Sequence, residues 1–178
     1  IELDMSHLYK YSNSSLLVQS TENIPEGSYA SQLKNKEESG ELSALSTVVP
    51  LRNGVMLSAV TALAMSLYPD LLVDVYLGNH ADDAGGHAYA DCTSEFTYYM
   101  RKAMLEGSYN RVYLISPFVN STKADIVSVG LKLNVPYELT TSCYRGGEKA
   151  CGKCGTCIDR LAAFRANHAK DLIEYEED

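Results

Sequence analysis

Four of the five cysteines in this chain lie within fifteen residues near its carboxyl end. Cys151, Cys154 and Cys157 are each separated by two residues, and Cys143 precedes Cys151 with seven residues between them. This spacing lets four thiolates converge on one metal ion. It predicts a tetrahedral zinc site, and such a site constrains the fold of the whole carboxyl-terminal segment.

The residues between the cysteines favour a metal site. Gly152 and Gly155 each follow a cysteine, where a residue without Cβ allows a tight turn around the metal. Four thiolates on a divalent cation carry a net charge of minus two, which nearby basic residues would offset. The basic residues close in sequence are Arg145, Lys149, Lys153 and Arg160.

Three other interpretations of the cysteines stay open, namely an iron–sulfur cluster, two disulfides and simple burial of thiols. No Cys-Pro closes the run as in bacterial ferredoxins, and disulfides need an oxidising compartment, of which the sequence gives no sign. Zinc is therefore favoured. A closed four-thiolate site has no open coordination position, so it predicts a role in folding rather than in catalysis.

The rest of the chain alternates predicted helices and strands. Apolar periodicity predicts helices over 54–68 and 94–105, and valine-rich apolar runs predict strands over 72–78 and 112–116. A further helix is expected after Thr122, and a last one over 158–167. This order predicts an α/β fold, with a Rossmann-like, mostly parallel sheet between flanking helices and the zinc site at the carboxyl end.

At 178 residues and 46% hydrophobic content, the chain can bury one ordinary core, so a single α/β domain over 1–178 is expected. Residues 20–47 are polar, with many serines and with Pro25, Gly27 and Gly40, which predicts a long loop. Residues 143–168 are expected to form the zinc-binding segment and the last helix. A net charge of −8 argues against stable nucleic-acid binding. No run of eighteen apolar residues or signal peptide exists, so we expect a cytoplasmic protein without membrane attachment.

The loop after the first predicted strand carries Asp82, Asp83 and Asp91 together with His80. Ligands of open parallel sheets bind outside the carboxyl ends of the strands, so polar chemistry is expected there. The aspartates could bind magnesium, accept a hydrogen bond from a substrate amine or take a proton from ammonium; the alternative is Asx turns. His80 is an acid or base candidate, against a structural hydrogen bond. Cys92 is interpreted as a partly buried thiol rather than a nucleophile, because the spacing reveals no base partner.

A set of motifs between Val49 and Asp159 resembles the 7-cyano-7-deazaguanine synthase family of queuosine precursor biosynthesis. The motifs occur in the family's order: Pro50-Leu-Arg-Asn, Gly78-Asn-His-Ala-Asp-Asp with Asp91-Cys92, Lys123 followed by Gly130, Val135-Pro-Tyr-Glu-Leu-Thr, and Ser142-Cys-Tyr-x-Gly-Gly-Glu-Lys-x-Cys-Gly-Lys-Cys. One motif would be weak evidence, but the set is specific.

The resemblance implies an adenine-nucleotide hydrolase-like fold and an ATP-dependent carbon–nitrogen ligase. Such an enzyme would adenylate 7-carboxy-7-deazaguanine, let ammonia displace AMP, and dehydrate the resulting amide to the nitrile after a second activation. ATP, structural zinc and magnesium are the implied cofactors, and a homodimer is the implied assembly. Converting a carboxylate oxygen into a phosphate-linked leaving group lowers the barrier that ammonia must cross.

The resemblance also implies roles for residues near two predicted helix starts. Lys123 resembles a lysine that related enzymes place against phosphates, with an exposed helix-start lysine as the alternative. Arg52 and Asn53 could bind the nucleotide or the substrate carboxylate, and for Arg52 a salt bridge at the sheet edge is equally compatible.

The chain departs from the family pattern in one respect, because one of the family's motifs is absent. The family's pyrophosphate loop, Ser-Gly-Gly-x-Asp-Ser, has no match in these residues, and Asp83-Ala-Gly-Gly is not a substitute. Ile1 resembles the end of a later strand, so we expect an N-terminally truncated chain that does not turn over ATP alone. Two other functions stay open: a zinc-dependent interaction module, and another adenylating tRNA-modification enzyme that holds an iron–sulfur cluster.

Overall fold

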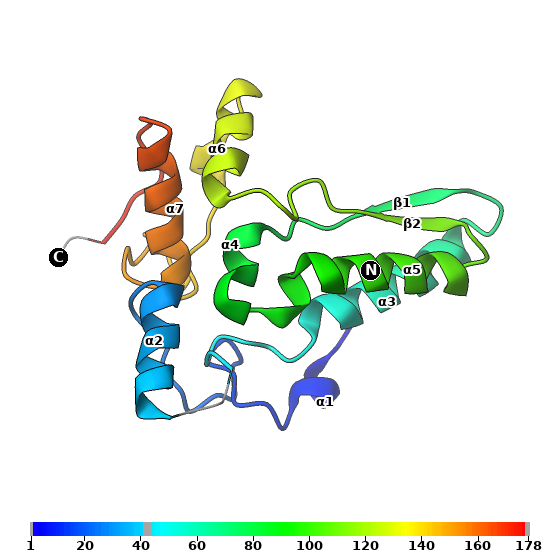
Figure 1. Ribbon diagram of the computed structural model, residues 1–178, viewed down its shortest axis with the longest axis horizontal. Coiled ribbons are helices and arrows are strands. Elements are labelled where there is room, and N and C mark those ends of the chain that lie inside the picture. The colour runs from blue at the N-terminus through cyan, green and yellow to red at the C-terminus, as the bar shows by residue number, and fades with distance from the viewer. Residues whose placement is uncertain (1, 41–43, 177–178) are drawn as a thin grey trace. The chain divides into compact units, whose positions relative to one another are not determined.

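The computed structural model describes residues 2–40 and 44–176 (Figure 1). The chain divides into two compact units, residues 1–50 with 123–178, and residues 51–122. The prediction of a single domain over 1–178 stays a prediction. The strand end expected at Ile1 lies outside the described residues.

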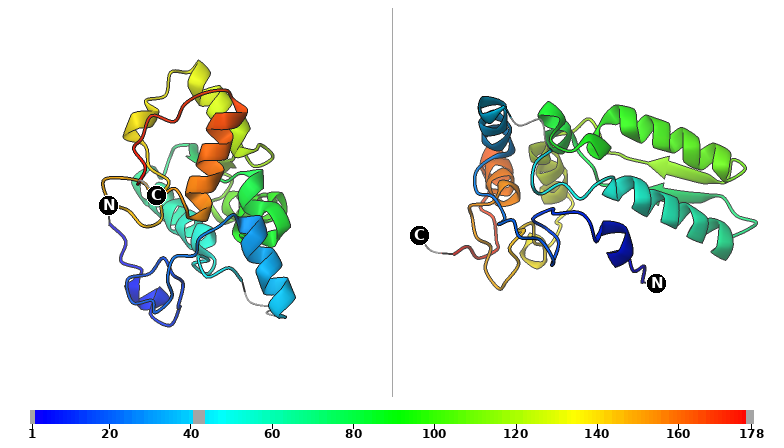
Figure 2. Two further views of the ribbon diagram at one scale, coloured as in Figure 1. Left: turned by 90° about the vertical axis from the view of Figure 1, so that its left-hand side faces the viewer. Right: turned by 90° about the horizontal axis from the view of Figure 1, so that it is seen from below.

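The unit of residues 51–122 is a strand pair covered by two helices. β1 (Val73–Tyr76) and β2 (Val112–Ile115) run parallel, with Val73 opposite Val112. The helices α3 (Arg52–Leu67) and α5 (Ser94–Gly107) lie next to each other along the same face of the strands (Figures 1 and 2). The predicted α/β class, with a parallel sheet and flanking helices, is confirmed.

The core of this unit lies between the two helices and the strands. Its buried residues are Leu57, Ala64, Val75, Met104, Val112 and Leu114. α3 carries no charged side chain after Arg52, yet its outer face is exposed and borders an apolar groove of about 430 Å³ along β1. The structure buries one side of α3, the side that carries Leu57, Thr61 and Ala64.

The predicted loop after β1 is mostly short helical turns. α4 (Ala81–Ala84) is followed by the 3₁₀ turns η1 (Gly85–His87) and η2 (Ala90–Cys92). η2 ends directly before α5, whose N-cap residue Thr93 accepts a hydrogen bond from the backbone N–H of Phe96. The loop that carries the predicted site residues is therefore folded back on the strand end.

The unit of residues 1–50 and 123–178 is helical in its regular structure. It contains α1 (Ser6–Tyr9), α2 (Tyr29–Ser39), α6 (Lys123–Lys132), η3 (Tyr137–Leu139) and α7 (Gly155–Ala166). α6 packs on α7 through Val127, Ala163 and Phe164, and the Asn167 side chain donates to the carbonyl of Ala124. Among the described residues, every helix is too short or insufficiently apolar to cross a bilayer.

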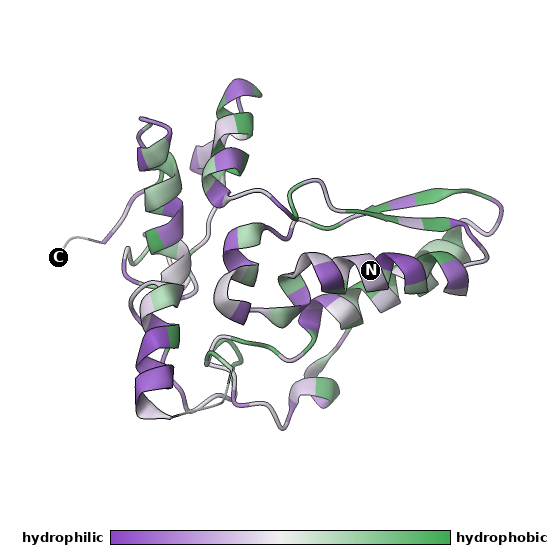
Figure 3. Cartoon of the chain, in the orientation of Figure 1, coloured by the Kyte–Doolittle hydropathy of each residue, from purple (hydrophilic) through white to green (hydrophobic). Residues whose placement is uncertain are grey.

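The prediction of a loop over 20–47 is wrong for its middle part, which forms α2. Ser28 caps the N-terminus of α2 by accepting from the backbone N–H of Ser31, and Gly40 ends the helix in the left-handed conformation. Lys34 and Glu38 form an i,i+4 ion pair on its exposed side. The helix is mostly hydrophilic (Figure 3), which is why apolar periodicity did not reveal it. Residues 41–43 lie outside the described part.

Candidate functional site

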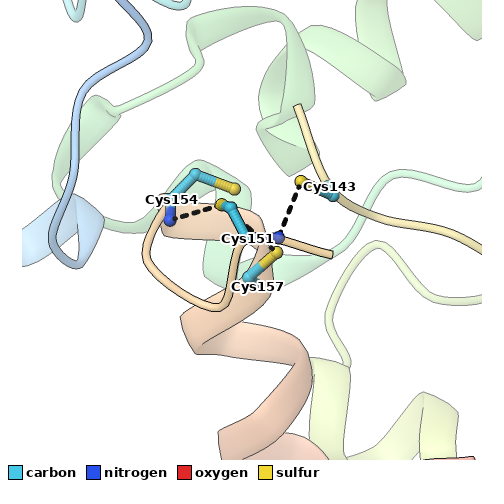
Figure 4. Close-up of side chains that lie close together, drawn as sticks. All are labelled: Cys143, Cys151, Cys154 and Cys157. Atoms are coloured by element: carbon cyan, nitrogen blue, oxygen red, sulfur yellow. Dashed lines mark hydrogen bonds between the residues drawn. The ribbon is translucent and has the colours of Figure 1, made fainter. Parts of the chain in front are cut away.

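The four predicted metal ligands come together at the start of α7. Cys154 is the N-cap residue of α7, Cys157 lies in its first turn, and Cys143 and Cys151 come from the segment before it. Their four Sγ atoms lie within 4.8 Å of one another and point inward (Figure 4). Zinc–thiolate bonds of about 2.3 Å place tetrahedral sulfurs about 3.8 Å apart, so the cluster fits zinc.

The chemistry of the four thiols also fits a metal and excludes disulfides in this structure. All five cysteines are free, and the Sγ atoms of Cys151 and Cys157 are 4.0 Å apart. The backbone N–H groups of Cys151 and Cys154 donate to the sulfurs of Cys143 and Cys151, each at 3.4 Å. Such donors stabilise thiolates, as expected around a metal ion.

The thiols differ in acidity because their surroundings differ. Burial acts to raise the pKa of Cys154, but hydrogen bonds from the Thr156 hydroxyl and from backbone groups outweigh it and bring the pKa to about 7. Burial raises the pKa of Cys151 and Cys157. Metal binding must therefore displace protons from two thiols that hold them tightly.

The two glycines in the cysteine run serve different purposes. Gly152 has φ +69°, so it makes the tight turn that the sequence predicts. Gly155 is the first residue of α7, and a Cβ there would lie 2.7 Å from Cε1 of Tyr29. A close approach between α2 and α7, rather than a turn at the metal, therefore requires Gly155.

The basic residues around the cluster tie neighbouring segments to it. Arg145 pairs with Glu26 at 2.6 Å and Lys149 with Glu174 at 3.3 Å. Arg160 is buried and forms an ion pair with Asp171. Each of these three cations therefore pairs with a carboxylate outside the cysteine run, a contact that the sequence analysis did not predict.

Two of the predicted strand-end residues form a pair in the unit of residues 51–122. His80 is buried, and its Nε2 lies 3.2 Å from Oδ2 of Asp83. Asp82 is exposed on α4. The pair gives the imidazole a carboxylate partner, an arrangement that suits either a proton carrier or a structural contact.

Two further predicted residues meet at the start of α3. Asp91 accepts a hydrogen bond from the backbone N–H of Asn53 at 2.9 Å, and the Asn53 side chain donates to the Asp91 carbonyl. The Asp91 carboxylate thereby accepts from a backbone N–H in the first turn of α3, and negative charge is favourable at this end of a helix. Arg52, the first residue of α3, is exposed.

Cys92 lies beside these residues as a buried thiol. Asn53 Nδ2 is 3.4 Å from its sulfur. Burial, followed by the charges of Asp83 and Asp91, raises the pKa of Cys92 to about 12. The thiol is therefore protonated at neutral pH, which supports the interpretation that it is not a nucleophile.

Asn79 is a site residue that sequence reasoning missed. It is buried and donates to the Cys92 carbonyl and to Thr97 Oγ1, both at 2.9 Å, while its own oxygen accepts from the Ser116 hydroxyl. It thus joins the ends of β1 and β2 to the start of α5. The signal was its position directly after the predicted strand, where polar side chains gather.

Lys123 lies in the other unit, at the first position of α6. Its Nζ is 3.9 Å from Oδ2 of Asp159, which lies on α7. The two side chains are only 18% and 22% exposed, so the predicted exposed alternative for Lys123 does not hold. Asp159 was missed because its partner lies 36 positions away in the sequence.

A comparison with known proteins identifies relatives over most of the chain. A family model described as "Queuosine biosynthesis protein QueC" matches residues 1–168. Proteins named 7-cyano-7-deazaguanine synthase are 45% identical over 91% of the chain in Caldicellulosiruptor saccharolyticus and 43% identical over 86% in Pseudoalteromonas atlantica. A third, from Psychromonas ingrahamii, is 37% identical over 98% of the chain.

The chain spans 65%, 63% and 72% of the length of these three relatives. Family membership rests on the breadth of these matches, and the family model's range, residues 1–168, includes all four clustered cysteines and the strand-end loop. The chain belongs to the queuosine biosynthesis protein QueC family.

Proposed function

We propose that this protein takes part in the ATP-dependent conversion of 7-carboxy-7-deazaguanine and ammonia to 7-cyano-7-deazaguanine. The observation that carries the proposal is the 45% identity, over 91% of the chain, to a protein named 7-cyano-7-deazaguanine synthase. The reaction would pass through an adenylate and an amide, and a second activation would dehydrate the amide. Each activation makes a poor electrophile reactive by attaching a good leaving group.

In this proposal Lys123 binds a phosphate of ATP or of the adenylate, since an ammonium at a helix N-terminus adds to the attraction for anions. Arg52 and Asn53 contribute to nucleotide or carboxylate binding. Asp82, Asp83, Asp91 and His80 would bind magnesium, orient the substrate or accept a proton from ammonium. The His80–Asp83 distance of 3.2 Å supports a concerted role for these two residues.

The four cysteines would hold one zinc ion as a structural cofactor, supported by the spacing of their sulfurs. When bound, zinc would supply a fixed tetrahedral anchor for the start of α7. Five free thiols suit the reducing cytoplasm, the proposed compartment. Metal analysis tests the metal directly: one zinc per chain is expected, whereas a brown, iron-containing protein would favour an adenylating enzyme with an iron–sulfur cluster.

The reaction is tested by measuring nitrile and pyrophosphate formation from ATP, 7-carboxy-7-deazaguanine and ammonium. Two proteins are compared: this 178-residue chain, and a fusion that adds a segment with the family's pyrophosphate loop, Ser-Gly-Gly-x-Asp-Ser. We expect turnover by the fusion and none by the chain alone. A folded, zinc-loaded fusion that binds ATP but makes no nitrile would refute the proposed reaction, and turnover by the chain alone would refute its expected dependence on the loop.

A homodimer is the proposed assembly, on the strength of the family resemblance. Sedimentation velocity of the zinc-loaded protein is the direct measurement. A mass of two chains, unchanged on dilution to micromolar concentration, is expected. A single-chain mass at every concentration would contradict it.

A further inference from the structure

Lys123 and Asp159 connect α6 and α7, two helices that pack on each other within one unit. Lys123 begins α6 and Asp159 lies in the first turns of α7, and their charged atoms are 3.9 Å apart. Behind this pair, α6 and α7 are packed through Val127 and Phe164. The ammonium therefore lies at the edge of a packed helix pair, and its side chain is mostly withdrawn from water.

A lysine is poorly suited to that position unless another group holds it. The N-terminus of a helix carries partial positive charge, so an ammonium at the first position of α6 is repelled by the helix. A lysine side chain also has many rotamers, and ordering it costs conformational entropy. A carboxylate on the neighbouring helix offsets both effects, because it attracts the ammonium and selects one direction for it.

The position of Asp159 depends in turn on the cysteine cluster. Asp159 follows Cys157 by two residues, and Cys154 is the N-cap residue of the same helix. Residues two apart on a helix point to nearly opposite sides, so the first turn of α7 can present a thiolate to the metal site and a carboxylate to α6. A metal bound by Cys154 and Cys157 would fix this turn, and with it the carboxylate.

We propose that Asp159 is the positioning residue for Lys123, and that the cysteine cluster acts on Lys123 through it. The proposal rests on the proposed function in one respect, namely that Lys123 meets a phosphate. The closed metal site would then do more than stabilise the fold. It would fix the first turn of α7 and, through Asp159, orient the Lys123 side chain. The ion pair itself can be tested whether or not the protein turns over ATP.

The test observes the Lys123 ammonium directly by NMR of the zinc-loaded protein with ¹⁵N-labelled lysine, at low temperature. Lys123→Arg identifies the Lys123 signal by deleting it. We expect a protected ammonium signal in the wild type, its loss in Asp159→Asn, and its return in Asp159→Glu. The control Glu138→Gln, which removes an exposed acid of the same unit, should leave the signal unchanged. A Lys123 signal unaltered by Asp159→Asn would overturn the proposal, as would its absence from the folded wild type.

A second pair of variants tests the link to the cluster. Cys157→Ser removes a ligand that lies on α7, and Cys143→Ser removes one that lies outside it. Loss of the Lys123 signal is expected for Cys157→Ser and its retention for Cys143→Ser. Equal effects of the two substitutions, including loss of the signal in both through unfolding, would overturn the proposed path through the α7 turn. Failure of the nitrile-forming reaction would leave all these signals as expected, so the two failures are distinguishable.

Discussion

Asn79 is the residue whose loss should disturb the strand-end site most. Asn79→Ala removes three buried hydrogen bonds and leaves the Ser116 hydroxyl and the Cys92 carbonyl without these partners. A buried polar group without a partner costs about 1–3 kcal/mol, so we expect a loss of about 2–4 kcal/mol in the free energy of unfolding. Urea unfolding measures it. Asn120→Ala, which changes an exposed asparagine in the same unit, is the control and should have almost no effect. Equal unfolding midpoints for the two variants would mean that water replaces the Asn79 contacts.

At the scale of residues, the sequence located the site better than it assigned the roles. It placed Asn53 and Asp91 in the site, and the structure brings these two together. The sequence analysis did not identify Asn79 and Asp159 as site residues. Their partners, Ser116 and Lys123, lie far along the chain, and no local spacing in the sequence indicates such a pairing. The catalytic and binding roles of Asp82, His80 and Arg52 stay predictions.

The close approach of α2 to α7 yields a prediction at the scale of elements. A Cβ at Gly155 would meet the Tyr29 ring at 2.7 Å, so Gly155→Ala must push α2 or the ring away. Overpacking of this kind costs about 1–3 kcal/mol. Thermal unfolding is the measurement, and Gly107→Ala is the control because a Cβ there meets nothing within 4 Å. A destabilised Gly155→Ala whose stability recovers in the double variant with Tyr29→Ala would identify the contact; the same melting temperature for the two glycine variants would contradict it.

A second element, the segment after α7, is held by one buried ion pair. Arg160 donates two hydrogen bonds to the Asp171 carboxylate, from Nε at 2.6 Å and from Nη2 at 2.8 Å. The Tyr175 hydroxyl donates a third hydrogen bond to the same carboxylate. Burial acts to raise the pKa of Asp171, but these hydrogen bonds outweigh it and leave the pKa below its ordinary value of 3.8. The pair therefore stabilises the fold above pH 3.8, and the stabilisation is lost as the pH falls through the lowered pKa.

Breaking this pair should be far more costly than breaking an exposed one. Asp171→Asn leaves Arg160 buried and uncompensated, which costs about 3–5 kcal/mol, whereas removing the exposed Lys149–Glu174 pair with Glu174→Gln costs about 0–1 kcal/mol. Guanidinium unfolding at pH 7 measures both. The difference between wild type and Asp171→Asn should shrink below pH 3.8, because the wild-type carboxyl then takes up its proton. A difference that stays constant down to pH 2 would exclude Asp171 as its source.

The elements with a clear apolar periodicity were predicted well. α2 shows why an element without that periodicity was not predicted. α3, β1, α5 and β2 were all placed from runs of apolar residues, because burial in the unit's own core imposes that pattern. α2 exposes most of its surface, so its sequence resembles a loop, and its stability comes from a cap at each end and one buried tyrosine. α7 begins three residues earlier than expected because its first turn lies inside the cysteine run.

For the whole molecule, the two compact units have separate cores, and the sequence did not predict this division. The core of residues 51–122 is aliphatic, whereas the core around the cysteines consists of Cys151, Cys154 and Cys157 with Ala150. Periodicity describes each element alone and does not state which elements share a core. A metal-held core depends on its ligands, and an aliphatic core does not.

Removal of the metal should therefore unfold one unit and spare the other. A structural zinc site contributes its binding free energy to folding, so a chelator or Cys154→Ser should abolish the slow hydrogen exchange of α7 and of residues 143–157. α3 and α5 should keep theirs, because Leu57 and Met104 are buried in a core without cysteine. Hydrogen exchange measured by mass spectrometry distinguishes these segments, and Cys92→Ser, which removes the one cysteine outside the cluster, is the control. A zinc-replete Cys154→Ser protein with an unchanged melting temperature would contradict the prediction, and so would equal loss of protection in both units.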